Sequence, residues 1–92
     1  MYIILTSQII SIGVTRSKLP SSPLAGRDFI LLQNVGTGTI YIGNSVVTAN
    51  TANTGGYQLL SSGEWIAGYE SNVDIYGVMS AGSGQILIQE GK

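Results

Sequence analysis

The stretch LLQNVGTGTIYIGN, residues 31–44, decides the fold, because it reads either as a phosphate-binding loop or as a turn between strands. Two apolar runs flank the link Gly36-Thr37-Gly38. A dinucleotide-binding fingerprint needs a third glycine where Tyr41 stands, and a helix where TIYIG is strand-like. No Lys-Ser or Lys-Thr pair supplies a Walker-type loop. We therefore predict a β-hairpin whose link contains a residue at positive φ, as glycine allows.

The rest of the chain repeats this pattern of short β-forming runs. β-branched and aromatic residues recur between Gly, Ser, Asn and Pro, and no long stretch keeps helical spacing. In QILIQE, for example, Ile86 and Ile88 share one face. We expect strands over residues 2–5, 8–14, 28–35, 39–43, 56–60, 64–69, 72–79 and 84–90. Such a series predicts an all-β fold, a small antiparallel β-sandwich or a barrel-like fold.

The chain is expected to divide into three parts. Residues 1–14 form an N-terminal β arm, residues 15–27 form a link that holds both prolines, and residues 28–92 form the β-sandwich domain. The arm either pairs within its own sheet or is donated to the open edge of a neighbouring subunit. The sequence leaves both arrangements open.

Size and composition indicate association with other subunits. A chain of 92 residues hides only about 60–65% of the surface that its unfolded form exposes. Charged residues make up 10% of this chain, where about 25% is usual. The chain has no cysteine for disulfides. A surface so poor in charge is either coated with Ser, Thr, Asn and Gln or largely covered by other subunits. Because small domains often obtain missing burial by oligomerising, we expect the second arrangement.

The charge pattern argues against nucleic acid and membrane partners. The net charge is −1, and the positive residues, Arg16, Lys18, Arg27 and Lys92, do not form a run. A nucleic-acid interface normally has a Lys/Arg patch. The apolar opening of the chain is interrupted by Thr6, Ser7 and Gln8 and is too short to span a bilayer. We expect no nucleic acid and no membrane insertion.

The residues needed for catalysis are scarce. The chain has no histidine and no cysteine, so neither a Ser-His triad nor a Cys nucleophile can be assembled. Its carboxylates are dispersed and are interpreted as surface charges: Asp28, Glu64, Glu70, Asp74 and Glu90. Asp28, next to Arg27, is interpreted as a polar cap at a strand entry. We expect that the chain is not an enzyme and that it has no catalytic, cofactor or metal site.

Aromatic residues and a polar loop suggest a second class of function. Trp65 and Tyr69 have the same strand parity, so they can form an aromatic platform for sugar rings. The loop over residues 45–56 adds Asn50 and Asn53 as candidate ligand contacts. This pattern fits a carbohydrate-binding module. The competing interpretation places Trp65 in the hydrophobic core, because large aromatics are highly buried on average.

Several motifs, taken in order, resemble a known family. They are Arg27 before an apolar strand, Gln33-Asn34-Val35-Gly36, Tyr41-Ile42-Gly43, Val47-Thr48, the turn Leu60-Ser61-Ser62-Gly63-Glu64, Ile75-Tyr76-Gly77-Val78 and the closing Glu90. Together they resemble a small β-sandwich of tailed-bacteriophage virion proteins, over about residues 19–90. The loop TANTANTGG is longer than the compact link expected there.

The resemblance implies a structural role in a virion, as a head decoration, head-fibre or tail accessory protein. It implies no catalytic residues. The expected partners are copies of this chain and other virion proteins, with a host-surface glycan as a further candidate. We expect a homo-oligomer, such as a trimer or a larger ring, or tight attachment to the capsid. The expected location is the virion.

Overall fold

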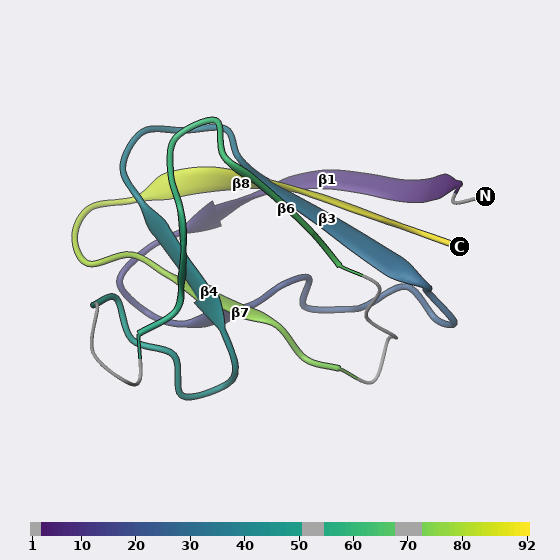
Figure 1. Cartoon of the computed structure of the whole chain (residues 1–92), viewed down its shortest axis with the longest axis horizontal. Helices are drawn as coiled ribbons and strands as arrows, with labels where there is room; N and C mark the ends of the chain where they lie inside the picture. The colour runs from purple at the N-terminus through teal and green to yellow at the C-terminus, as the bar shows by residue number, and fades with distance from the viewer. Residues whose placement is uncertain (1–2, 51–54, 68–72) are drawn as a thin grey trace.

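A computed structural model describes residues 3–50, 55–67 and 73–92, and every regular element in these ranges is a β-strand (Figure 1). The strands are β1 (Ile4–Ile12), β2 (Ser17–Lys18), β3 (Phe29–Asn34), β4 (Ile40–Gly43), β5 (Tyr57–Leu59), β6 (Glu64–Ala67), β7 (Tyr76–Val78) and β8 (Gly84–Gly91). The all-β class predicted from the sequence is confirmed.

The strands form two four-stranded sheets, with the orders β1-β8-β3-β6 and β2-β7-β4-β5. The pairings between these strands are antiparallel. The first strand pairs with the last, the second with the seventh, the third with the sixth and the fourth with the fifth: β1·β8, β2·β7, β3·β6 and β4·β5. One long antiparallel hairpin folded over into two sheets has this set of pairs. This connectivity is that of a jelly roll, a double-sheet sandwich of eight strands. The sequence left a sandwich and a barrel open, and the structure is the sandwich.

The core lies between the sheets and is mainly aliphatic. On β3 and β8 every second side chain points inward, and Leu32 lies opposite Ile88 in the register. Both are fully buried, as is Ile86, which confirms the shared face expected for Ile86 and Ile88. The second sheet contributes Ile40 and other buried side chains. Full burial of each such side chain contributes about 1.5–3 kcal/mol.

The N-terminal segment forms one strand rather than the two that were expected over residues 2–5 and 8–14. β1 is continuous, with a register shift between Ile4 and Thr6 where a β-bulge lies opposite β8. The polar residues Thr6, Ser7 and Gln8 do not break it, because they are at least partly exposed at the edge of the sheet. The expected link contains the short strand β2, which pairs with β7.

The hairpin predicted for residues 31–44 is wrong, because β3 and β4 belong to different sheets. The link between them crosses from one sheet to the other at the end of the sandwich (Figure 1). Gly38 has a φ of 83°, so the expected residue at positive φ is confirmed. A glycine link between two β-forming runs is compatible with either connection, and the pairing partners decide which one forms.

Asn34 organises this crossing. The side chain is fully buried, and its amide nitrogen donates to the carbonyls of Gly38 at 2.9 Å and Leu59 at 3.0 Å. Its amide oxygen accepts from the Gly36 N–H at 3.1 Å. In addition, the Ser61 hydroxyl donates to the Gly36 carbonyl at 2.7 Å. Asn34 therefore joins the β3–β4 link to the end of β5.

Candidate functional site

The outer edge of β1 is the first candidate site. β1 is an end strand of its sheet and pairs with β8 on one side, and within the described part of the chain no strand pairs with its other side. Its register with β8 is unbroken from Thr6 opposite Glu90 to Ile12 opposite Gly84. In the structure of this single chain, the arm thus pairs within its own sheet.

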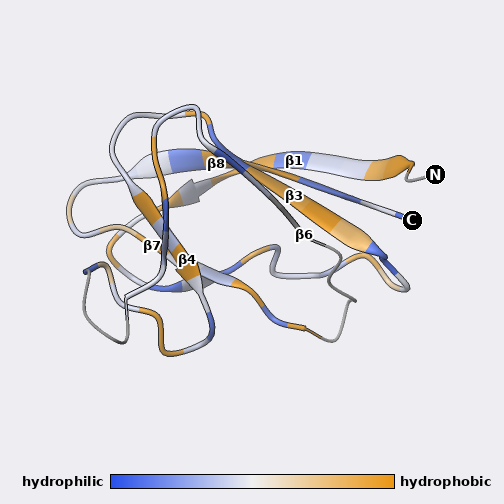
Figure 2. Ribbon diagram, viewed as in Figure 1, coloured by the Kyte–Doolittle hydropathy of each residue, from blue (hydrophilic) through white to orange (hydrophobic). Residues whose placement is uncertain are grey.

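β1 and Ile3, the residue before it, carry large apolar side chains that are exposed to solvent. Ile3, Ile4, Leu5 and Ile9 are 57%, 51%, 54% and 58% exposed. Figure 2 shows the start of the strand as a hydrophobic segment at the N-terminal end of the molecule. Only toward its end does β1 enter the core, where Ile12 is buried. Contiguous exposed apolar side chains on a small protein indicate an interaction surface.

This edge lacks the usual protection against pairing with other strands. Natural edge strands are blunted by charges, especially lysine, or by proline. No residue from Ile3 to Thr15 is charged or a proline, although β1 does have a bulge near Leu5. The unprotected strand extends over residues 6–12, beyond that bulge. A long and uncharged edge strand can accept a strand from another chain.

A second candidate site is a hollow beside Trp65. Trp65 lies on β6 opposite Leu32 and packs partly buried against the core. With Tyr57, Asn44 and Asp74 it lines a hollow of about 300 Å³. Two aromatic side chains with an amide and a carboxylate suit a polyhydroxylated ring, which has both apolar faces and hydroxyl groups.

Among the described residues, Trp65 is the only sequence-predicted ligand contact that lines this hollow. Tyr69 and Asn53 lie outside the described residues, so the proposed pairing of Trp65 with Tyr69 is not described. Asn50 is exposed and does not line the hollow beside Trp65. Tyr57, which sequence reasoning did not choose for the platform, does line it. Parity within one strand could not have identified Tyr57, because it lies on the other sheet.

A larger hollow of about 630 Å³ lies between the β1–β2 link and the segment after β4. Arg16 is the charged residue of its lining, and its guanidinium donates to the Val47 carbonyl at 3.3 Å. Its other lining residues include Val78 and Met79, and none of the described residues that line it is aromatic. This hollow is therefore a weaker candidate for a ligand site than the one beside Trp65, which is lined by two aromatic side chains, an amide and a carboxylate.

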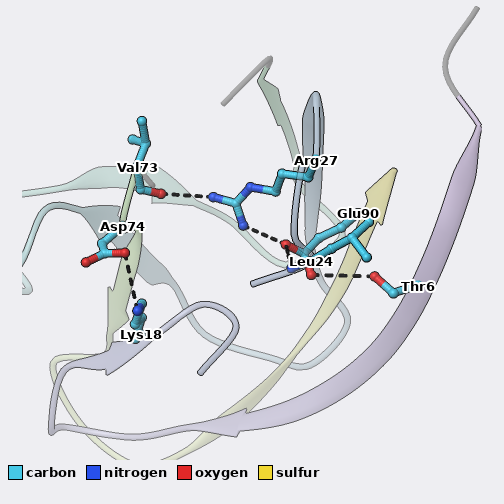
Figure 3. A network of polar contacts seen from close by, with 7 residues as sticks. All are labelled: Thr6, Lys18, Leu24, Arg27, Val73, Asp74 and Glu90. Carbon is cyan, nitrogen blue, oxygen red and sulfur yellow. Dashed lines mark hydrogen bonds and ion pairs between the residues drawn. The ribbon is translucent and has the colours of Figure 1, made fainter. Parts of the chain in front are cut away.

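Arg27 and Glu90 form a buried ion pair that the sequence analysis missed (Figure 3). Their side chains are 0% and 1% exposed, and Arg27 Nη1 lies 2.6 Å from Glu90 Oε2. Arg27 also donates to the Val73 carbonyl at 2.9 Å, and the Leu24 N–H donates to Glu90 at 3.1 Å. The interpretation of Glu90 as a surface charge is wrong, because Arg27 balances its charge inside the protein.

This pair has a structural role in fixing the end of the sandwich near the termini. It joins the link before β3 to β8 and to the segment before β7, and the Thr6 hydroxyl donates to Glu90 at 3.5 Å. The only sequence signal was the presence of both residues in the family-like pattern, at its beginning and its end. Asp28 is exposed, and its N–H donates to the Gly91 carbonyl at 2.8 Å.

The described residues contain no group of three or more acidic, His or Cys side chains that could hold a metal ion. Nor do they include a helix long and apolar enough to cross a membrane. The fold and its surfaces thus define a jelly-roll sandwich with an open, apolar edge. Comparison with models of protein families gives no match, and comparisons with curated proteins and with solved structures give none either.

Proposed function

We propose that the chain is a non-enzymatic structural component of a tailed-phage virion. It acts as a capsid decoration or as a head-fibre or tail accessory subunit, through self-association and docking on other virion proteins. The observation that carries this proposal is the β1 edge, whose apolar side chains are exposed and whose residues 3–15 have no charge.

Burial of the exposed aliphatic side chains at this edge would contribute free energy to assembly. Full burial of a Leu or Ile side chain contributes about 1.5–3 kcal/mol, and Ile3, Ile4, Leu5 and Ile9 each retain half or more of their exposure. Covering them therefore adds about 1 kcal/mol for each side chain, besides the hydrogen bonds of a new strand pair. In a particle with many copies, modest contacts are sufficient because they act together.

The fold supports the same class of function by analogy. Jelly rolls occur in viral capsid proteins, and also in lectins and cupins, so the fold alone does not decide among these roles. The family-like motifs favour the first, and one of them has a clear structural reason. In Gln33-Asn34-Val35-Gly36, Asn34 is the residue that organises the crossing between the sheets.

The test is the protein content of purified particles. Virions of a tailed phage that encodes the chain are purified by density gradient and probed with antibody raised against the recombinant protein. We expect a constant number of copies in each particle and labelling at one defined location. A chain that is made during infection but is absent from intact particles would contradict the proposal.

A second candidate function is glycan binding, and the hollow lined by Trp65 and Tyr57 favours it. It is tested by a glycan array with the unmodified protein and with Tyr57→Ala. Tyr57 is 56% exposed, so its removal should leave the fold intact, and Leu60→Ala is a control of similar exposure outside the hollow. Binding lost only in Tyr57→Ala supports a glycan site, and an array without binding rejects it.

A further inference from the structure

We propose that the β1 edge pairs antiparallel with β1 of a second copy of this chain, around a two-fold axis at Ile9. This inference rests on the self-association in the proposed function and specifies its geometry. The two sheets β1-β8-β3-β6 would then join edge to edge into one continuous sheet, with both β1 strands at its centre.

The absence of charge along the edge favours an identical partner. Near a two-fold axis each residue meets the same short segment of its own sequence, so a charge there would face a like charge. Residues 3–15 contain no charge, although 10% of the chain is charged. A partner of different sequence would impose no such restriction.

The regular part of β1 determines the register. In an antiparallel pair, directly opposite side chains point to the same face of the sheet, so a two-fold axis must place one residue opposite itself. The register with β8 is regular over Thr6–Ile12 and shifts between Ile4 and Thr6. An axis at Ile9 pairs this whole segment with itself, whereas an axis at Ser7 sets the bulge opposite Ile9 of the second copy.

The resulting side-chain pairs are compatible on the exposed face. Ile9, the most exposed of the large apolar side chains of β1, lies against Ile9 of the second copy. Ser7 lies opposite Ser11, and both of these hydroxyl residues are exposed. On the inner face, Gln8 lies opposite Ile10, and its long amide side chain can extend past Ile10 to solvent. At the axis, the two Ile9 side chains thus make an apolar contact, and a pair of serine hydroxyls lies on either side of it.

The register is tested by single cysteine substitutions in the full chain, which has no natural cysteine. Opposite residues of an antiparallel pair have Cβ atoms about 4.5–5.5 Å apart, close to the range of disulfides. Under mild oxidation Ile9→Cys should form a covalent dimer at least about tenfold faster than Ser83→Cys, an exposed control in the link before β8. Ser7→Cys and Ser11→Cys should each remain mostly uncrosslinked alone but crosslink when mixed.

Sedimentation equilibrium of the unmodified protein provides the second measurement. We expect twice the mass of the 9.6 kDa chain. Three results would overturn the inference: a monomer at high concentration, a trimer or ring, or an Ile9→Cys rate equal to that of Ser83→Cys. The outcome is independent of the particle assay, because a dimeric chain absent from virions refutes only the proposed function. A virion protein without the Ile9 crosslink refutes only this inference.

Discussion

Two regions of the molecule depart in opposite ways from the usual rule that apolar side chains are buried and charged ones exposed. One is the end of the sandwich that Arg27 and Glu90 hold together, and the other is the outer edge of β1. The first buries two charges, and the second exposes four large aliphatic side chains. They are neighbours, since Thr6 of β1 donates to Glu90. The difference between them is where the partner lies. Arg27 and Glu90 pair with each other, whereas no strand of the described residues pairs with the outer edge of β1.

This difference separates a contribution to folding from a contribution to association. A buried charge is tolerated only when it is paired and hydrogen-bonded, so the network around Glu90 must form as the chain folds. An exposed apolar edge contributes little to folding, and its surface remains available until another strand covers it. Substitutions in the two regions should therefore change different measured quantities.

The largest effect on folding is expected for Arg27→Ala. Removal of the guanidinium leaves Glu90 buried without its counter-charge and leaves the Val73 carbonyl without its donor. Breaking a buried ion pair in this way costs about 3–5 kcal/mol. That is a large share of the roughly 5–15 kcal/mol that stabilises a typical domain. The free energy of unfolding, measured by urea denaturation, should fall by this amount.

Lys18→Ala is the matched control for a partly exposed ion pair. Lys18 lies 3.3 Å from Asp74, and their side chains are 34% and 49% exposed. Solvent screens such a pair, so its removal should cost no more than about 1 kcal/mol. If Arg27→Ala and Lys18→Ala lowered the free energy of unfolding by the same amount, burial would not make the Arg27–Glu90 pair more important for stability than an exposed pair.

A smaller effect is expected for Asn34→Ala, which removes a buried neutral group. The substitution leaves the carbonyls of Gly38 and Leu59 without their donor at the crossing between the sheets. Unsatisfied buried groups cost about 1–3 kcal/mol. Urea denaturation should show this loss, and it should be smaller than that of Arg27→Ala.

Asn44→Ala separates burial from local turn geometry. Asn44 also accepts a hydrogen bond two residues ahead, from the Val46 N–H at 3.0 Å, but Asn44 is exposed. A change within about 0.5 kcal/mol is expected for such a surface position. If Asn44→Ala lowered the free energy of unfolding as much as Asn34→Ala, the effect at Asn34 would come from its local turn and not from its hydrogen bonds to Gly38 and Leu59.

The fold class could be predicted from the sequence because side-chain alternation is a local property. The inward positions of β8, including Ile86 and Ile88, follow directly from it. The pairing of strands is not local, since β3 pairs with β6 and β8 rather than with the next strand. The stretch 31–44 therefore reads as a hairpin although it connects two sheets.

The candidate sites could be predicted only where one segment carries the whole signal. The lack of charge in β1 is visible in the sequence, which predicts an arm that pairs either within its own sheet or with a neighbouring subunit. By contrast, Arg27 and Glu90 are 63 positions apart, and each resembles an ordinary surface charge until the fold brings them together. Tyr57 joins Trp65 at the hollow for the same reason, across the two sheets.

The smallest effect on folding is expected at the β1 edge, for Ile9→Lys. Ile9 is 58% exposed, so the free energy of unfolding at high dilution should change by no more than about 0.5 kcal/mol. Association should be lost, because the lysines of the two copies would face each other across the axis. Sedimentation equilibrium at high concentration should give a monomer.

Leu60→Lys controls for the charge itself, because Leu60 is 57% exposed but lies outside β1. It should leave both folding and association unchanged. If Ile9→Lys instead unfolded the protein, the β1 edge would belong with the Arg27–Glu90 network as a part of the fold. If Ile9→Lys left association intact, the copies would meet elsewhere, and the exposed side chains of β1 would need another partner. Only folding kept and association lost together assign the edge to assembly.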